Sequence, residues 1–417
     1  MPKKLGSHIA PAKRSEKDPN KKVVTIDTLS TNTTKVVPDT VRTDILGNEI
    51  VVKTVSQKDK MAGVYEKANT VKLLGRANIL ISHAFLRTSP LERDAMLAVA
   101  PYTNMLIDSG AYTNFQIALG KLKGTKPINF ESYMSDCTKY YSQCWNYIAF
   151  DVVRNNQATR DNYETMLDRG LDPIPVLTPT ESVDYAMELV GKSSHHRICI
   201  SGSATGSVGK LWERIQKVHK LTQGKALIHG LGLMRYPTIF QLPLATVDAS
   251  TMTTGSRFGT ISFYDRLEGV KIIHWSDLTA KAKEQWMWKL LEYGIDIDSL
   301  KEFGNYRTAA GIPSLVTMYA YLKFLEHCTE KNLGLFFAIP NSSWLIITAA
   351  TYYTVSQNGG KLNYKLGQET VMQLRELKKT QPEKFYQMMG DIFRTGTSYQ
   401  TNPLTVEQDI TKRFPIK

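Results

Sequence analysis

The chain has 417 residues, 42% apolar and 22% charged, which is the composition of a soluble globular protein with a large core. The net charge of +13 points to a polyanionic partner, nucleic acid first and an acidic membrane second, although some basic proteins bind neither. The four cysteines form no Cys-x-x-Cys pair, so neither a zinc site nor a disulfide framework is expected. We expect free thiols in a reducing cytoplasm.

Two segments precede the main body of the chain. Residues 1–22 are polar and lysine-rich, without the apolar core of a signal peptide, and predict a flexible basic arm. This supports a cytoplasmic location. Residues 23–70 are rich in Val and Thr and predict a small β-structured cap, with a hairpin at Leu46–Lys53.

Short apolar runs alternate with helical patterns through residues 71–277, which predicts a parallel sheet and an α/β fold. The expected strands are Asn78–Ser82, Met105–Asp108, Tyr147–Asp151, Ile174–Leu177, Arg197–Ser201, Ala226–His229, Ala245–Asp248 and either Thr260–Tyr264 or Val270–Trp275. Eight strands over about 200 residues fit a (β/α)8 TIM barrel, the predicted catalytic domain, better than an open sheet. The chain contains no dinucleotide-binding or P-loop motif.

Residues 278–417 have a helical pattern and predict a helical C-terminal region. Leu333–Val355 is the most apolar window of the chain, but Pro340 and its polar neighbours interrupt it. We expect two helices broken at Pro340 in Phe336–Ser356, and no membrane span.

Three aspartates, Asp108, Asp151 and Asp248, stand at the ends of predicted strands. One such aspartate is more often a helix or turn cap, but three at the same end of a barrel indicate a site, because active sites form there. The loops Ser201–Gly206 and His229–Leu233 follow two other strands and are rich in small residues. Their glycines either let backbone amides approach a ligand or simply permit tight turns.

Asp108-Ser-Gly-Ala111, Phe150-Asp151, His229-Gly-Leu231 and Val247-Asp248 occur in this order. In these short motifs, over about Asn78–Trp275, the chain resembles the queuine/archaeosine-type (tRNA) guanine transglycosylases. That family uses a TIM barrel to exchange guanine in a nucleic acid for a 7-deazaguanine. The resemblance implies that Asp248 is the nucleophile and that Asp108 recognises the base and acts as general acid/base.

The resemblance also implies the substrate-binding residues. Asp151 would read the guanine edge, since a carboxylate accepts from N1–H and the exocyclic amine together. Ser203 falls where the family has a Gln-Gly segment, and without that amide it is a weaker match. Arg257 is assigned to a flanking phosphate, or else it pairs with an acidic neighbour. The full expected set is Ser109, Gly110, Asp151, Ser203, Gly230, Leu231 and Arg257.

The expected chemistry agrees with these roles. Cleavage of an N-glycosidic bond passes through an oxocarbenium-like state, which Asp248 would capture as a covalent glycosyl–enzyme. The departing guanine gains a proton and the incoming base loses one, so a second carboxyl group with a raised pKa is needed. Asp108 fits this role, because a nearby like charge raises one of the two pKa values.

Two departures from the family pattern matter. No Cys-x-Cys-x-x-Cys…His cluster follows Asp248, so the zinc subdomain of the transfer-RNA members is absent or replaced. Ala111 stands where those members have glycine. Lack of zinc, the basic arm and the distinct C-terminal region resemble the phage and bacterial DNA branch, which inserts 7-deazaguanine derivatives into DNA.

We therefore expect a phage-type DNA-guanine transglycosylase without a cofactor. Its partners would be duplex or locally opened DNA and a 7-cyano- or 7-aminomethyl-type 7-deazaguanine, with a homodimer or an accessory protein left open. Three alternatives stay open: a tRNA-guanine transglycosylase without zinc, a catalytically silent nucleic-acid-binding subunit, and a phosphate-handling barrel enzyme acting on a small metabolite.

Overall fold

The computed structural model describes residues 24–29, 40–43, 49–55, 70–73, 77–201, 208–249, 251–253, 260–274, 289–295, 311–396, 406–409 and 413–416. The chain forms two compact units, residues 1–61 and residues 62–417. The predicted basic arm at residues 1–22 lies outside the described residues.

The first unit contains a three-stranded sheet. Its strands are β1 (Val24–Leu29), β2 (Thr40–Thr43) and β3 (Glu49–Val55), in the order β1-β3-β2. β1 runs parallel to β3, and β2 pairs antiparallel with β3. Of the residues predicted as a hairpin, Leu46–Lys53, residues 49–53 lie in β3, whose antiparallel partner β2 precedes the predicted range, and residues 46–48 lie outside the described residues. The role of this unit as a cap stays a prediction.

The second unit is built on a curled sheet of eight parallel strands in the order β7-β6-β5-β14-β11-β10-β9-β8. The strands are β5 (Ala77–Ser82), β6 (Thr103–Asp108), β7 (Asn146–Tyr147), β8 (Val176–Leu177), β9 (Arg197–Ser201), β10 (Leu227–Leu231), β11 (Thr246–Ala249) and β14 (Gly334–Ala338). A parallel bridge between Ile148 and Ile174 joins the two end strands. Ala149 donates to Ile174, and Ile174 to Tyr147, both at 2.8 Å. This closure is consistent with a TIM-like barrel.

The inside of the curled sheet is filled by apolar side chains. All eight strands, or a residue adjoining them, contribute to this inner cluster: Leu80, Leu106, Ile148, Val176, Cys199, Leu227, Ala245 and Phe336. A second, larger cluster packs the sheet against its helices. The strands are therefore buried on both faces, which explains why their sequences are continuous apolar runs and not alternating patterns.

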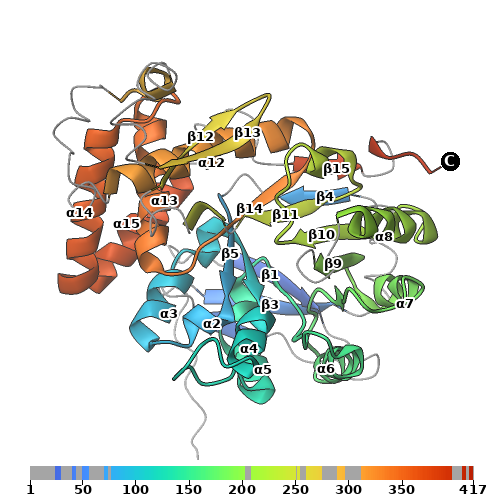
Figure 1. Ribbon diagram of the computed structural model, residues 1–417. Helices are drawn as coiled ribbons and strands as arrows, with labels where there is room; N and C mark the ends of the chain where they lie inside the picture. The colour runs from blue at the N-terminus through green and yellow to red at the C-terminus, as the bar shows by residue number, and fades with distance from the viewer. Residues whose placement is uncertain are drawn as a thin grey trace, which may run out of the picture. The chain divides into compact units, whose positions relative to one another are not determined.

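Helices follow one another around the outside of the sheet (Figure 1). They are α3 (Pro90–Leu97), α5 (Phe130–Lys139), α6 (Asn156–Asp168), α7 (Tyr185–Lys192) and α8 (Val208–Leu221), with the short α2 (His83–Leu86) and α4 (Ala111–Ala118) after β5 and β6. Ser89, Asn129 and Asn155 begin α3, α5 and α6, each accepting a backbone N–H with its side chain. These caps satisfy amides that lack a partner within the helix.

The eighth strand of the sheet is not the one expected. The predicted strands Thr260–Tyr264 and Val270–Trp275 correspond to β12 (Thr260–Asp265) and β13 (Gly269–His274), which pair with each other antiparallel, outside the eight-stranded sheet. Their tight turn favours local pairing. The eighth position belongs to β14, so the sheet continues beyond residue 277, where the barrel was predicted to end.

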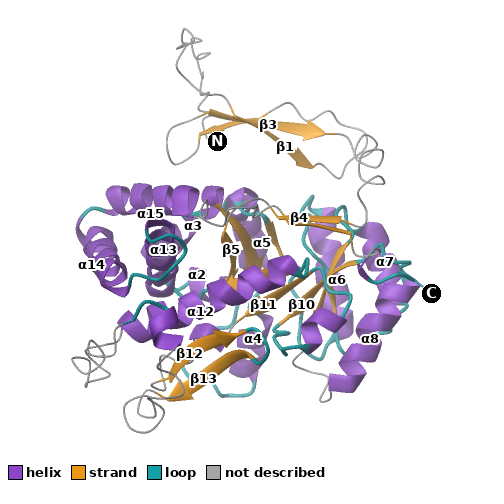
Figure 2. Ribbon diagram, turned by 90° about the horizontal axis from the view of Figure 1, so that it is seen from above, coloured by secondary structure: helices purple, strands orange, loops and turns teal. Residues whose placement is uncertain are grey.

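The C-terminal region is not wholly helical. Its helices are α12 (Gly311–Glu330), α13 (Ser342–Gln357), α14 (Tyr364–Thr380) and α15 (Pro382–Gly396), and β12 packs on α12, where Ser262 donates its N–H to Thr317 (Figure 2). The expected helix from Phe336 to Pro340 is wrong, because this segment forms most of β14. A five-residue apolar run has no periodicity that separates strand from helix. No helix within the described ranges is long and apolar enough to cross a membrane.

The N-terminal end of the curled sheet contacts the last described residues of the chain. β15 (Val406–Asp409) pairs antiparallel with β4 (Thr70–Leu73). Phe414 packs against the inner cluster, and Arg413 donates to the carbonyl oxygens of Leu244 at 3.2 Å and Asn332 at 2.7 Å, which precede β11 and β14. The chain's own C-terminal segment therefore covers this end of the sheet.

Candidate active site

The structure places all three predicted aspartates at the C-terminal ends of parallel strands. Asp108 is the last residue of β6, and Asp248 is the third residue of β11. The strand predicted at Tyr147–Asp151 is shorter than expected, with β7 ending at Tyr147 and Asp151 lying in the turn beyond the bridge residue Ile148. Because the strands are parallel, the three carboxyl groups face the same end of the sheet.

The three carboxyl groups also act on one another. Burial raises the pKa of Asp108, and the negative charge of Asp248 raises it further. Burial raises the pKa of Asp151 to about 7, with the charge of Asp108 as the next cause. Burial, followed by the charges of Asp151, Asp108 and Asp248, raises the pKa of the Cys199 thiol in the inner cluster. All three carboxyl groups are therefore close enough to Cys199 to act on its thiol.

The turn after β6 ties two of the aspartates together. The Ser109 side chain is fully buried and donates its hydroxyl to Oδ1 of Asp151 at 2.8 Å. The N–H of Gly110 donates to Oδ2 of Asp108 at 3.0 Å. Gly110 has a φ of 83°, and a Cβ there would lie 2.4 Å from Cδ1 of Ile128, so only glycine fits this turn. The expected site residues Ser109 and Gly110 thus hold the carboxyl groups of the site.

Asp248 is only 5% exposed and uses one of its two oxygens for structure. The backbone N–H of Gly232 donates to Oδ1 at 2.7 Å, and Nε2 of His229 lies 3.5 Å from the same atom. No residue in the described part of the chain forms a hydrogen bond with Oδ2. These two contacts to Oδ1 hold the Asp248 carboxylate in one orientation.

His229 and Gly232 also contribute to the site: the sequence assigned no role to the His229 side chain, and Gly232 belongs to the loop whose glycines were expected either to let backbone amides approach a ligand or to permit tight turns. Nδ1 of His229 lies 2.8 Å from the hydroxyl oxygen of Thr246, so the imidazole is fixed between β10 and β11. The signal was present in the register: His229 is paired with Thr246, and Asp248 follows Thr246 by two residues, on the same face of the strand. A parallel pairing of the two strands would have predicted a contact between His229 and Asp248.

The remaining expected residues fall into two groups. Gly230 lies in β10, where a Cβ would come within 2.8 Å of Cδ1 of Leu233, and the half-buried Leu231 packs on the inner cluster. Their expected contact with a base stays a prediction. Ser203 and Arg257 lie outside the described residues, so the structure says nothing of their roles.

No group of three or more His, Cys, Asp or Glu side chains is placed to hold a metal ion anywhere in the described ranges. The cysteines are free, with Cys137, Cys199 and Cys328 buried and Cys144 partly buried.

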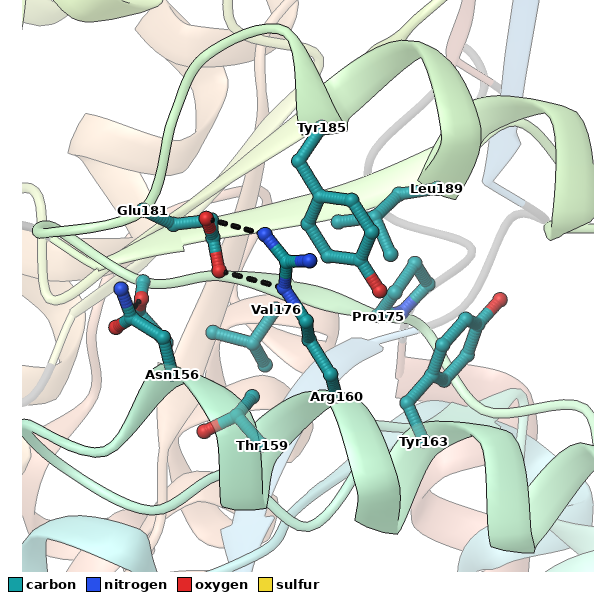
Figure 3. Close-up of a pocket in the computed structure, with 10 residues that line it drawn as sticks. Asn156, Thr159, Arg160, Tyr163, Pro175, Val176, Glu181, Tyr185 and Leu189 are labelled. Carbon is teal, nitrogen blue, oxygen red and sulfur yellow. Dashed lines mark hydrogen bonds and ion pairs between the residues drawn. The ribbon is translucent and has the colours of Figure 1, made fainter.

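A small pocket lies between α6, β8 and α7, and none of the three aspartates lines it (Figure 3). Arg160 crosses it and makes two hydrogen bonds with Glu181, at 2.9 and 2.6 Å, with its guanidinium 4.0 Å from the centre of the Tyr185 ring. The charged groups of this pocket satisfy each other. It is therefore a less suitable ligand site than the three carboxyl groups.

The aspartate site combines two chemical properties. Asp248 has one oxygen without a hydrogen-bond partner among the described residues, as a nucleophile or an ion-stabilising group requires. Burial raises the pKa of both Asp108 and Asp151, so both bind a proton more tightly than an ordinary carboxyl group does, and the pKa of Asp151, about 7, lets it exchange protons close to neutral pH. A suitable substrate for such a site is a molecule with a C–N bond whose nitrogen-containing group gains a proton as the bond breaks, or loses a proton as the bond forms.

Comparison with known proteins adds no relative from which a role can be transferred. No protein-family model matches the chain, and no curated protein matches its sequence.

Proposed function

We propose that the chain is a DNA-guanine transglycosylase that exchanges guanine in DNA for a 7-deazaguanine derivative. The observation that supports this best is the set of three carboxyl groups at one end of the curled parallel sheet: Asp108 and Asp151 have raised pKa values, and Oδ2 of Asp248 has no hydrogen-bond partner among the described residues. This is the set that base exchange at C1′ requires.

In the first half of the reaction, Oδ2 of Asp248 attacks C1′ of the target nucleotide as the bond from C1′ to N9 of guanine breaks. Gly232 holds the other oxygen of this carboxylate, so the attacking atom is already oriented. Asp108 gives its proton to the departing guanine. The products are free guanine and a covalent bond between Asp248 and the deoxyribose.

In the second half, the carboxylate of Asp108 accepts the N9 proton of the incoming 7-deazaguanine. N9 then attacks C1′ and the bond to Asp248 breaks, so the configuration at C1′ is retained after two displacements. No atom or electron pair is left over, and Asp108 returns to its protonated state.

Asp151 has the role of reading the base edge. The carboxylate accepts hydrogen bonds from N1–H and the exocyclic amine, and these donors favour its ionised form. A pKa of about 7 in the free protein means that base binding easily removes its proton. The guanine edge and its 7-deaza analogues present the same two donors, so one site accepts both.

The proposal extends to the domains, the cellular location and the substrates of the protein. The eight-stranded sheet is a TIM-barrel catalytic domain, with the β-rich unit as an N-terminal cap and the C-terminal helices as an appended region. The protein is phage- or bacterium-encoded and acts in the cytoplasm, on DNA and a 7-cyano- or 7-aminomethyl-type base. The net charge of +13 supports a nucleic-acid substrate, and the lack of the zinc motif supports DNA over transfer RNA.

Radiolabelled guanine incubated with duplex DNA, single-stranded DNA or transfer RNA tests the proposal, with Asp248→Asn as the control. Label that enters DNA, and is lost in the control, supports a DNA transglycosylase. Label that enters only RNA would show that the substrate of the exchange reaction is transfer RNA and not DNA. Label in neither polymer contradicts a transglycosylase that works alone and favours a silent binding subunit.

A further inference from the structure

A basic projection stands directly beside Asp108. The chain leaves the sheet after Gly110, forms α4, continues through an exposed loop and returns at Ile128; we call residues 111–128 the α4 excursion. Its two ends are joined, because Asn114 accepts the N–H of Ile128 at 2.7 Å and donates to its carbonyl oxygen at 3.1 Å. The excursion is therefore a fixed feature at the C-terminal end of β6.

The excursion carries positive charge without negative charge. Residues 109–130 include Lys121, Lys123 and Lys126 but no Asp or Glu. All three lysines are exposed, and none forms an ion pair with any described residue. Elsewhere on the surface many cations pair with acids, as Arg169 does with Glu131 and Lys192 with Glu164. Unpaired cations next to one another attract an anion in a way that paired ones do not.

Two arginines extend the charge on both sides. Arg87 follows β5 and donates to the carbonyl oxygens of Lys126 and, at 2.8 Å, of Pro127, so it is fixed against the end of the loop. Arg154 follows Asp151, and its guanidinium lies 5.0 Å from the centre of the Phe115 ring of α4. Neither arginine pairs with a carboxylate in the described part of the chain. Three cations thus lie on the α4 excursion, and two more contact it.

Exposed rings and apolar side chains lie among these cations. Tyr112, four residues after Asp108, is 62% exposed, and Leu122 lies between two of the lysines and is 40% exposed. A helix that served only to cover the sheet would bury Tyr112, which lies on α4. Cations that follow a phosphate backbone, combined with an aromatic ring for a base, are the features of a surface for single-stranded nucleic acid.

We propose that the α4 excursion, together with Arg87 and Arg154, is the docking surface for a locally opened DNA strand, with the lysines on its phosphates and Tyr112 stacked on a base beside the target. The choice of DNA rests on the proposed function. The opened form follows from the same chemistry, because a base must leave the stack to reach buried carboxyl groups.

The test measures the binding of a fluorescent single-stranded DNA of about 20 nucleotides, by anisotropy at several salt concentrations. All proteins carry Asp248→Asn, so that no exchange occurs. The variant Lys121→Ala/Lys123→Ala/Lys126→Ala loses three phosphate contacts, and the slope of log affinity against log salt should fall by about 2. Its affinity at low salt should fall at least about tenfold.

A matched control removes the same charge elsewhere. Lys365, Lys379 and Lys384 on α14 and α15 are also exposed and form no ion pair with a described residue. Their triple alanine variant should change the slope by less than about 1. Equal losses in both triple variants would show a general effect of net charge and overturn the docking surface, as would an unchanged slope in the first.

Tyr112 provides a second test that does not depend on charge. Tyr112→Ala should weaken binding about tenfold with the slope unchanged, and Tyr112→Phe should restore it, because the ring and not the hydroxyl stacks on the base. If Tyr112→Ala binds the single-stranded DNA as tightly as the protein that retains Tyr112, the stacking role is overturned.

Guanine exchange by the otherwise native protein separates this proposal from the proposed function. Exchange into DNA with no effect of the triple lysine variant on binding refutes the docking surface alone. Loss of DNA binding in that variant, without any exchange by the native site, supports the docking surface and refutes the enzyme. Binding of transfer RNA but not DNA overturns the choice of DNA.

Discussion

The Ser109 hydroxyl donates a hydrogen bond to Oδ1 of Asp151 at 2.8 Å and thereby connects the turn after β6 to the end of β7. Ser109 is the neighbour of Asp108, so one short turn orients two of the three carboxyl groups. The bond favours the ionised form of Asp151 and opposes the rise in pKa that burial causes. This relationship gives the first of four predictions.

Ser109→Ala should raise the pKa of Asp151 above its present value of about 7, because the ionised form loses a donor. At neutral pH fewer molecules then carry the carboxylate that binds the base. The KM for the incoming base should rise about tenfold, and the activity should reach its plateau at a higher pH. The control is Ser182→Ala, because the exposed Ser182 hydroxyl also donates a hydrogen bond to an aspartate, Asp184. An identical pH profile in Ser109→Ala would disprove the role of this bond.

Asp151→Asn should stabilise the protein at alkaline pH. The folded pKa of Asp151 is raised, so the proton is bound more tightly in the folded state. The stability that this contributes is present at low pH and is lost as the pH rises towards about 7. Asparagine carries no charge to bury. The free energy of unfolding of Asp151→Asn should therefore exceed that of the native protein by on the order of 1–3 kcal/mol near pH 8, and the difference should vanish near pH 4. Chemical denaturation at both pH values measures the difference.

The control for that experiment is Asp161→Asn, on the exposed face of α6. It should change the free energy of unfolding by less than about 0.5 kcal/mol at both pH values. A gain in Asp151→Asn that does not depend on pH would mean that the carboxyl group is not the cause.

Gly110→Ala should destabilise the protein by several kcal/mol, more than the conformation of the residue alone explains. Gly124→Ala is the matched variant, because Gly124 also has a positive φ, 75°, but has no atom within 4 Å of the added Cβ. It should cost about 1 kcal/mol through backbone strain. At Gly110 the Cβ also meets Ile128 and the backbone N of Ala84, at 2.4 and 3.3 Å. Equal losses of stability would show that this contact is not tight.

His229→Leu should lower the kcat of exchange about 100-fold, as expected when one orienting group near a reacting carboxylate is removed. The KM for DNA should not change, because His229 is buried and lies beside Oδ1 of Asp248, not at the surface. His229→Gln, which keeps a polar nitrogen near that position, should recover part of the loss. A rise in KM with unchanged kcat would assign His229 to substrate binding and not to the nucleophile.

Seven of the eight strands of the sheet were predicted from the sequence, because strands buried on both faces are continuous apolar runs between turn residues. The eighth was not, since Gly334–Ala338 adjoins long helices and is separated from β11 by the β12–β13 hairpin and α12. Local pattern contains no information about which distant segment completes a sheet. The length of β7 was also overestimated, because its last residues bond across the end strands and not within a regular ladder.

The positions of the three aspartates followed from their place at the strand ends, and the structure brings them together. The role of Ser109 as a donor to Asp151 could not be predicted, because the bond depends on the left-handed turn at Gly110. His229 was predictable only from a strand register that the sequence alone does not fix. The pocket lined by Arg160 and Glu181 had no sequence signal, as its residues come from separate helices and loops.

The covalent intermediate on Asp248 is tested most directly by the mass of the protein after incubation with a guanine-containing DNA oligonucleotide and rapid denaturation. If Asp248 is the nucleophile, we expect a covalent adduct of protein and DNA that peptide analysis maps to Asp248 and that is absent in Asp248→Asn. Guanine exchange without any adduct, or with an adduct on another residue, would contradict the assignment of Asp248 as the nucleophile.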